Sequence, residues 1–264
     1  MVSNRPEPSG TSVTRSSDSN RRRNCFANKF LPYADKLDDE SQANLESIKN
    51  NLGKVVAMRE MGPAVMMSIR NLVTYIKLYG MKFSKEDHVK FVQLLLEMLV
   101  IPKLDPDAIN KISEAIFFLL RKREWLSTDD LQIEWRPLYD LFHLLVSRLS
   151  KKGELFNTTS SMEGNLQCAI QVCTPYFPPS ATQEILDELL SKLQPLDNGS
   201  GCEVITILNI FLNYEQGYEL WFDKLMAIWN GYHNPPWAGD FMTMYAVVGN
   251  KNLGHIDWEP HIPT

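Results

Sequence analysis

Apolar positions along the chain recur at helical spacing. Between positions 69 and 104 two apolar stripes flank a short polar corner: Ile69, Leu72, Val73 and Ile76 form the first, and Val89, Val92, Leu95, Leu96 and Leu99 form the second. Offsets of about three, four and seven residues place the side chains of each stripe on one helical face. The pattern predicts two helices, at about 64–79 and 85–100, whose apolar faces meet.

Residues suited to helix ends stand where these stripes begin and end. Gly80 suits the left-handed position after a helix, and Ser84 suits an N-cap, with Asp87 three residues later. Asp105-Pro106 is a cap followed by proline at the first helical position, which predicts the start of a further helix.

The remainder of the chain repeats the plan. Further stripes predict helices around Leu45, Ile109, Leu138, Leu166, Ile185, Leu220 and Phe241. We expect Leu138, Leu141, Leu145 and Leu149 on the inner face of one helix, a polar loop over 150–161, and a helix that begins near Met162. The segment 204–212 is apolar nearly all round, so composition allows a buried strand, but its helical surroundings favour a buried helix.

Helices of roughly 12 to 20 residues recur about every 20 to 25 residues, so that a pair spans about 40 to 50. This is the period of HEAT and armadillo repeats, which stack because one helix pair cannot bury its apolar face alone. The predicted fold class is therefore all-α, a HEAT/armadillo-like α-solenoid of antiparallel helix pairs. A plain helical bundle remains the alternative, because the periods are inexact.

Composition and charge divide the chain of 264 residues into two parts. Residues 1–28 are rich in Ser, Asn, Arg and Pro and are predicted to be a disordered basic tail, whereas 29–264 are predicted to form the helical repeats. Five arginines against two acidic residues give positions 1–23 a charge of +3, and because the whole chain carries −5, the remainder carries −8. An acidic body argues against direct nucleic-acid binding. Arg21-Arg22-Arg23 is either part of a nuclear import signal or simply a solvated tail.

The sequence lacks signals for secretion, membrane insertion and catalysis. No apolar run approaches the roughly 20 residues of a membrane span, and the polar N-terminus predicts no signal peptide. The four cysteines suit a reducing compartment; Cys168 and Cys173, five residues apart, match no zinc or redox motif and are expected to be packed in a helix. We therefore expect no catalytic residue, no cofactor and no metal, and no motif identifies the partner-binding residues.

Seven segments, in order, carry a resemblance to a known family. They read LPYADKLDDES, IRNLVTYIKLYGMKFSKEDHVKF, IPKL, EWRPLYDL, PYFPPSAT, ELWFDKLMAIW and GHIDWEPHIP. Together they resemble the N-terminal region of the large single-chain proteasome activators, and the resemblance runs from about Phe30 to Thr264.

The resemblance implies a function. Members of that family are long HEAT-like solenoids that form a dome over the end ring of the core proteasome, act without ATP, and admit peptides, unfolded proteins and acetylated histones. They act in the nucleus and cytoplasm, with links to DNA repair and spermatogenesis. The implied partners are thus the core proteasome and acetylated histones, with no membrane.

Two departures qualify that expectation. Family chains are several times longer, and they end in a hydrophobic-Tyr-X tail, whereas this chain ends His261-Ile262-Pro263-Thr264. We expect a fragment or short isoform that does not open the proteasome gate alone. The alternative function is a HEAT-type adaptor or scaffold with a different protein partner, since solenoids serve many roles.

Overall fold

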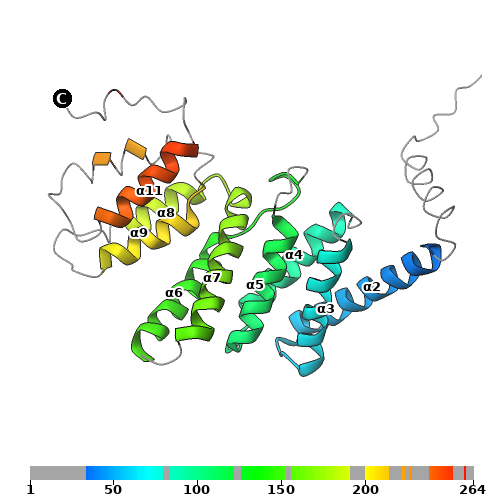
Figure 1. The fold of residues 1–264 in the computed structure, drawn as a ribbon. Helices are drawn as coiled ribbons and strands as arrows, with labels where there is room; N and C mark the ends of the chain where they lie inside the picture. The colour runs from blue at the N-terminus through cyan, green and yellow to red at the C-terminus, as the bar shows by residue number, and fades with distance from the viewer. Residues whose placement is uncertain are drawn as a thin grey trace, which may run out of the picture. The chain divides into compact units, whose positions relative to one another are not determined.

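The computed structural model describes residues 34–79, 84–121, 126–152, 156–190, 200–213, 222–223, 226–227, 238–251 and 259. All regular secondary structure in these residues is helical (Figure 1). The helices are α2 (Ala34–Met58), α3 (Pro63–Tyr79), α4 (Lys85–Leu99), α5 (Pro106–Leu120), α6 (Trp135–Lys152), α7 (Phe156–Cys173), η1 (Thr174–Tyr176), α8 (Ala181–Leu190), α9 (Ser200–Phe211) and α11 (Ala238–Lys251). The expected all-α class is confirmed for this part of the chain.

The chain divides into two compact units, Met1–Ile48 and Lys49–Thr264. In the first unit the described residues form the N-terminal part of α2, where the side chains of Leu45 and Ile48 are buried. The second unit contains the remaining helices and the site described below.

The predicted helix starts at Ser84 and Asp105 are confirmed. The Ser84 hydroxyl accepts a hydrogen bond from the Asp87 amide at 3.0 Å. The Asp105 carboxylate accepts bonds from the amides of Asp107 and Ala108, with Pro106 at the first helical position. Each cap satisfies amides that have no partner inside the helix, a contribution of about 1 kcal/mol.

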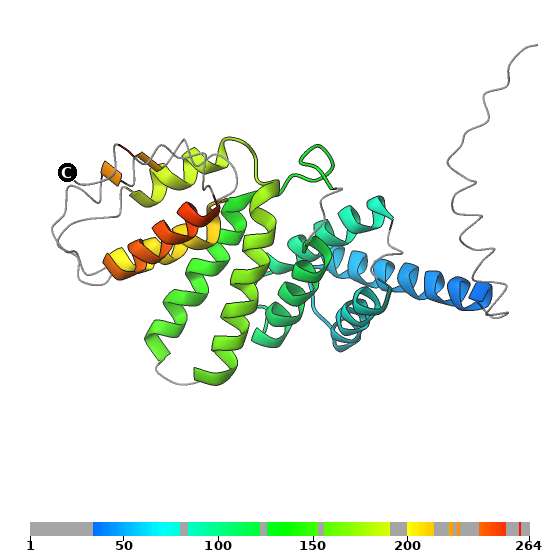
Figure 2. The same cartoon turned by 45° about the horizontal axis from the view of Figure 1, so that its top comes forward.

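Within the second unit, odd-numbered helices pack on one another in order. α5 packs against α3 and α7, α7 against α9, and α9 against α11, while α4, α6 and α8 each pack on the helix that follows them. Figures 1 and 2 show α6 and α7 side by side, joined at one end and so running in opposite directions. Packing between every second helix is consistent with an α-solenoid.

Two ion pairs show that α3 and α5 run parallel. Arg70 pairs with Asp107 at 3.1 Å, and Lys77, two turns later, pairs with Glu114, two turns after Asp107, at 2.9 Å. Parallel neighbours are expected when each is the same member of successive antiparallel pairs.

The core lies along α5 and the helices beside it. α5 buries Ala108, Ile109, Ile112, Ser113, Ala115, Ile116, Leu119 and Leu120, a broader surface than one stripe because three helices cover it. Fully burying an aliphatic side chain contributes about 1.5–3 kcal/mol. This helix therefore carries a large share of the stability of the second unit.

A cluster of aromatic rings joins α6 to α9. Phe211, at the end of α9, contacts Tyr139 and Phe142 of α6 with centroids 5.9 and 6.3 Å apart, and it stacks on Phe177. The buried Trp135 ring contacts Tyr139, and its Nε1 donates to Glu184 of α8 at 2.9 Å. Trp135 therefore links α6 to α8.

The structure corrects one expected boundary and decides one alternative. The polar loop over 150–161 is wrong in extent, because α6 continues to Lys152 and α7 begins at Phe156. Backbone hydrogen bonds continue a helix through turns that have few apolar residues, so a missing stripe does not mark its end. The helix preferred for 204–212 is confirmed by α9, and the strand alternative is wrong.

Several expectations concern residues outside the described part. These are the tail at 1–28, the turn at Gly80, most of the helix expected around Leu220, and the segment 252–264 apart from Glu259. They stay predictions.

Candidate functional site

The residues with reactive side chains are scattered in the structure. Among the described residues, no group of three or more His, Cys, Asp or Glu side chains is arranged to hold a metal ion. His88 is fully buried on α4, with its Nδ1 3.0 Å from the Ser84 carbonyl oxygen, and His143 is exposed on α6. No helix in the described ranges is long and apolar enough to cross a membrane.

The two cysteines of α7 face different surroundings. Cys173 is buried, and its burial raises the pKa of the thiol far above its ordinary value. Cys168 is exposed, so the expectation that both are packed inside is wrong for Cys168. Five residues on a helix turn through about 500°, which puts the two side chains on different faces.

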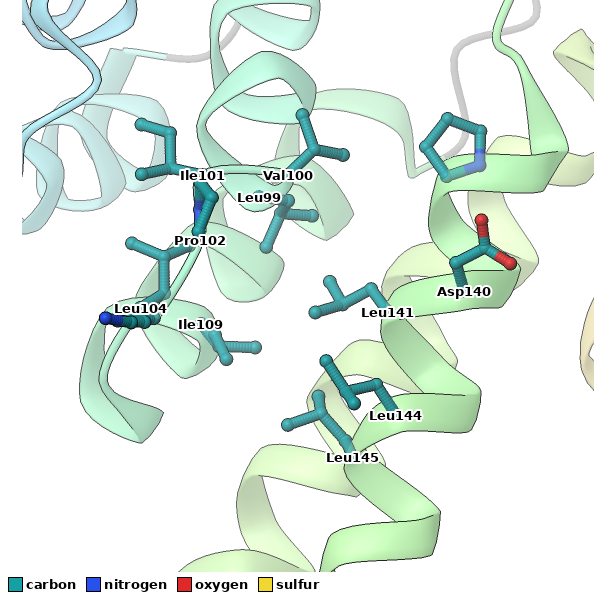
Figure 3. A pocket seen from close by; sticks show the side chains of 12 residues that line it. Leu99, Val100, Ile101, Pro102, Leu104, Ile109, Asp140, Leu141, Leu144 and Leu145 are labelled. Carbon is teal, nitrogen blue, oxygen red and sulfur yellow. The ribbon is translucent and has the colours of Figure 1, made fainter.

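An apolar groove beside α6 has the shape of a binding site. Its first cavity, of about 340 Å³, lies between α6 and the connection from α4 to α5, and it is lined chiefly by aliphatic side chains, including Leu99, Val100, Ile101, Leu141, Leu144 and Leu145. Figure 3 shows Leu141, Leu144 and Leu145 projecting from α6 toward Leu99 and Ile109 on the opposite side.

A second cavity of about 230 Å³ adjoins the first and shares Val100 and Pro137 with it. Leu96 and Glu97 of α4 form one side, and Ile133, Glu134 and Leu138 form the other. We call the two cavities together the α4–α6 groove.

Prolines and a left-handed turn position both walls. α4 ends at Leu99 with Val100 as its cap, and Pro102 cannot continue the helix because it has no amide hydrogen. Lys103 has φ 64°, a left-handed backbone that turns the chain toward the Asp105 cap. Pro137 lies in the first turn of α6, where a missing amide hydrogen costs nothing.

Charged contacts hold the second wall of the groove near α4. Lys85, at the start of α4, pairs with Asp130 at 2.6 Å, and Asp130 also accepts bonds from the Ser127 amide and hydroxyl. These contacts, the Lys85 bond first, lower the pKa of Asp130 to about 2. They fix the segment that leads into Gln132, Ile133 and Glu134.

Sequence reasoning placed the wall residues on the correct face of the helix but did not find the groove. Leu141 and Leu145 were expected on the inner face of α6; both are half-buried and line the first cavity. Periodicity predicts which face of a helix is apolar, but it does not predict which other element covers that face. The prolines at 102 and 137 are the available sequence signal, because they show that neither element continues across the gap.

The chain was also compared with known proteins. No family model matches it. It is 42% identical over 244 residues to "Proteasome activator complex subunit 4A" of Danio rerio and 38% identical over 266 residues to "Proteasome activator complex subunit 4" of Homo sapiens. The chain is therefore related to one segment of proteasome activator complex subunit 4.

The alignments cover most of this chain but only a small part of each relative. These alignments include 89% and 98% of this chain, but the chain spans only 13% and 14% of the length of those relatives. A more distant relative, "Proteasome activator subunit 4" of Arabidopsis thaliana, is 30% identical over 140 residues, which is 50% of this chain. The resemblance read from the seven sequence segments is confirmed by these alignments.

Proposed function

We propose that this chain forms N-terminal HEAT-like repeats of an ATP-independent proteasome activator, which caps the core proteasome. The activator promotes degradation of peptides, unfolded proteins and acetylated histones in the nucleus and cytoplasm. The observation that carries the proposal is the 38–42% identity, over about nine-tenths of this chain, to proteins named as proteasome activator subunits.

The helix order supports the repeat assignment. α3, α5, α7, α9 and α11 begin at positions 63, 106, 156, 200 and 238, which are roughly 40 to 50 residues apart. Each packs on the next, and the ion pairs between α3 and α5 set the two helices in the same direction. Such stacking gives an extended surface built from nearest-neighbour contacts.

The role of this chain is to bind and enclose, without chemistry of its own. In the described part of the chain the buried side chains are almost all apolar, and the polar contacts include helix caps and ion pairs between helices. A stiff wall of this kind helps to hold a substrate near the core proteasome, which carries the peptidase. Cleavage then takes place in the core particle, and no group of this chain enters the reaction.

A chimera tests the proposal directly. The aligned segment of Danio rerio subunit 4A is replaced by this chain, and binding to purified core proteasome and hydrolysis of a fluorogenic peptide are measured. We expect the chimera to bind the core particle and to stimulate hydrolysis as the unmodified relative does. A chimera that is folded by circular dichroism and gel filtration but does not bind the core particle would contradict the proposal and favour the adaptor function.

Two matched chimeras make the result specific to the fold of this chain. Ile116→Asp places a charge where α5 is fully buried and should abolish stimulation by unfolding the segment. Glu86→Gln changes an exposed side chain on α4 and should leave stimulation unchanged.

A further inference from the structure

The α4–α6 groove exposes large apolar side chains on both of its walls. Val100, at the end of α4, is 47% exposed, and Leu144 of α6 is 44% exposed. Beside them, Leu141 and Leu145 are only half-buried. Apolar side chains that face one another across an open groove gain free energy when a partner removes them from water.

The rim of the groove is acidic. Glu97, Glu134 and Asp140 stand against a single cation, Lys103. In the described part of the chain, none of the three carboxylates forms an ion pair, so their charges are not neutralised from within. A partner with basic residues around its apolar contacts complements this rim, whereas an acidic partner is repelled.

The walls favour a helix over an extended segment. The groove is lined by residues of α4, α5 and α6 and of the connections at 100–104 and 132–134, and all regular secondary structure of the described residues is helical. An extended peptide would find no free strand edge there and would bury unpaired amides and carbonyls against leucines. A helix satisfies its own backbone and offers only side chains, as in other helix-in-groove complexes.

We propose that the α4–α6 groove is the docking site for an amphipathic helix of a partner protein, with leucine-like side chains on its apolar face and Lys or Arg beside them. The apolar face covers Val100 and Leu144, and the basic residues lie against Glu97, Glu134 and Asp140. The proposal rests on this chain alone and is independent of proteasome binding.

The experiment uses the whole chain and a fluorescent synthetic peptide of leucine and lysine, with the leucines on one helical face. Fluorescence anisotropy should give saturable binding. The double variant Val100→Ser/Leu144→Ser should weaken binding roughly tenfold, because each substitution removes an apolar side chain whose exposed half the peptide would cover. Met67→Ser/Val247→Ser, at exposed apolar positions of α3 and α11 outside the groove, is the matched control and should leave the affinity unchanged.

The charge requirement is tested separately. Asp140→Lys/Glu97→Lys should weaken binding severalfold at low salt, and Glu86→Lys, on α4 outside the groove, should change it much less. All the substituted side chains are exposed, and circular dichroism checks that each variant is folded before affinities are compared.

Four outcomes would overturn the proposal. They are absence of saturable binding, equal weakening by the groove variant and its control, equal binding of a peptide with glutamate in place of lysine, and equal binding of a peptide with serine in place of leucine. Because these measurements contain no proteasome, failure of the chimera leaves their interpretation unchanged.

Discussion

The two sides of α5 differ in how completely they are filled. Toward α3 and α7 the helices lie in contact along their length, and side chains such as Ile112 and Ile116 are fully excluded from water. Toward α6, near the start of α5, the groove leaves Val100 and Leu144 nearly half exposed. The same kind of aliphatic side chain thus stabilises the fold on one side and is available to a partner on the other.

The polar contacts differ in the same way. Between α3 and α5, ion pairs repeat along the interface, and Lys77 also lies 4.7 Å from the Phe118 ring. Around α6 the links are local: Trp135 and Arg136, in the first turn, reach Glu184 and Glu188 of α8. The ion pairs of α3 and α5 thus repeat along the interface, whereas these links of α6 to α8 start from its first turn.

The largest effect is expected from the filled side. Ile116→Ala should lower the free energy of unfolding by about 2–5 kcal/mol, because it leaves a cavity in a closely packed site. Leu144→Ala, in the groove, should cost less than about 1 kcal/mol. Urea unfolding followed by circular dichroism measures both, and equal losses would remove the distinction between the two sides.

A smaller effect is expected at the first turn of α6. Trp135→Phe should cost about 1–2 kcal/mol, because it removes the Nε1 bond to Glu184 and part of a buried ring. Glu184→Gln keeps an acceptor for that bond and serves as the control in the same unfolding assay. If both variants had the same free energy of unfolding as the unmodified chain, the link between α6 and α8 would not contribute to stability.

The ion pairs should have still smaller effects. A double-mutant cycle with Lys77→Met and Glu114→Gln should give a coupling of about 0.5 kcal/mol that falls as salt is added, because Lys77 is half exposed. Partial burial raises the pKa of Glu114, but Lys77 and Lys111 together lower it by more than burial raises it. The net pKa therefore lies below its ordinary value. The longer pair of Arg136 and Glu188, at 3.4 Å, should show a weaker coupling; a stronger one would reverse the comparison.

The last prediction concerns pH. The pKa of Asp130 is about 2 in the folded chain, against an ordinary value of 3.8. Its bond to Lys85 therefore stabilises the fold at pH values above 3.8, and this contribution is lost as the pH falls toward 2. Lys85→Met should raise the pKa of Asp130 in an NMR titration. Lys90→Met, on the exposed side of α4, should leave the titration where it was.

Much of the fold follows from local pattern. The stripes at Ile69–Ile76 and Leu95–Leu99 gave helices within one or two residues of their observed bounds, and the caps at Ser84 and Asp105 formed as expected. These features depend on contacts within a few residues, which a sequence displays directly. The connection between α6 and α7 was less predictable, because a polar stretch can either belong to a helix or form a loop between two helices.

The sequence by itself determined the helices, their apolar faces, their caps and the relationship to proteasome activator complex subunit 4. The tertiary structure alone decided that Leu141 and Leu145 line a groove, that Cys168 faces outward and Cys173 inward, and which helices pair their charges. The physical reason is that helical periodicity arises within one element, whereas burial depends on which other element covers a face, and that is set by chain segments far away in sequence.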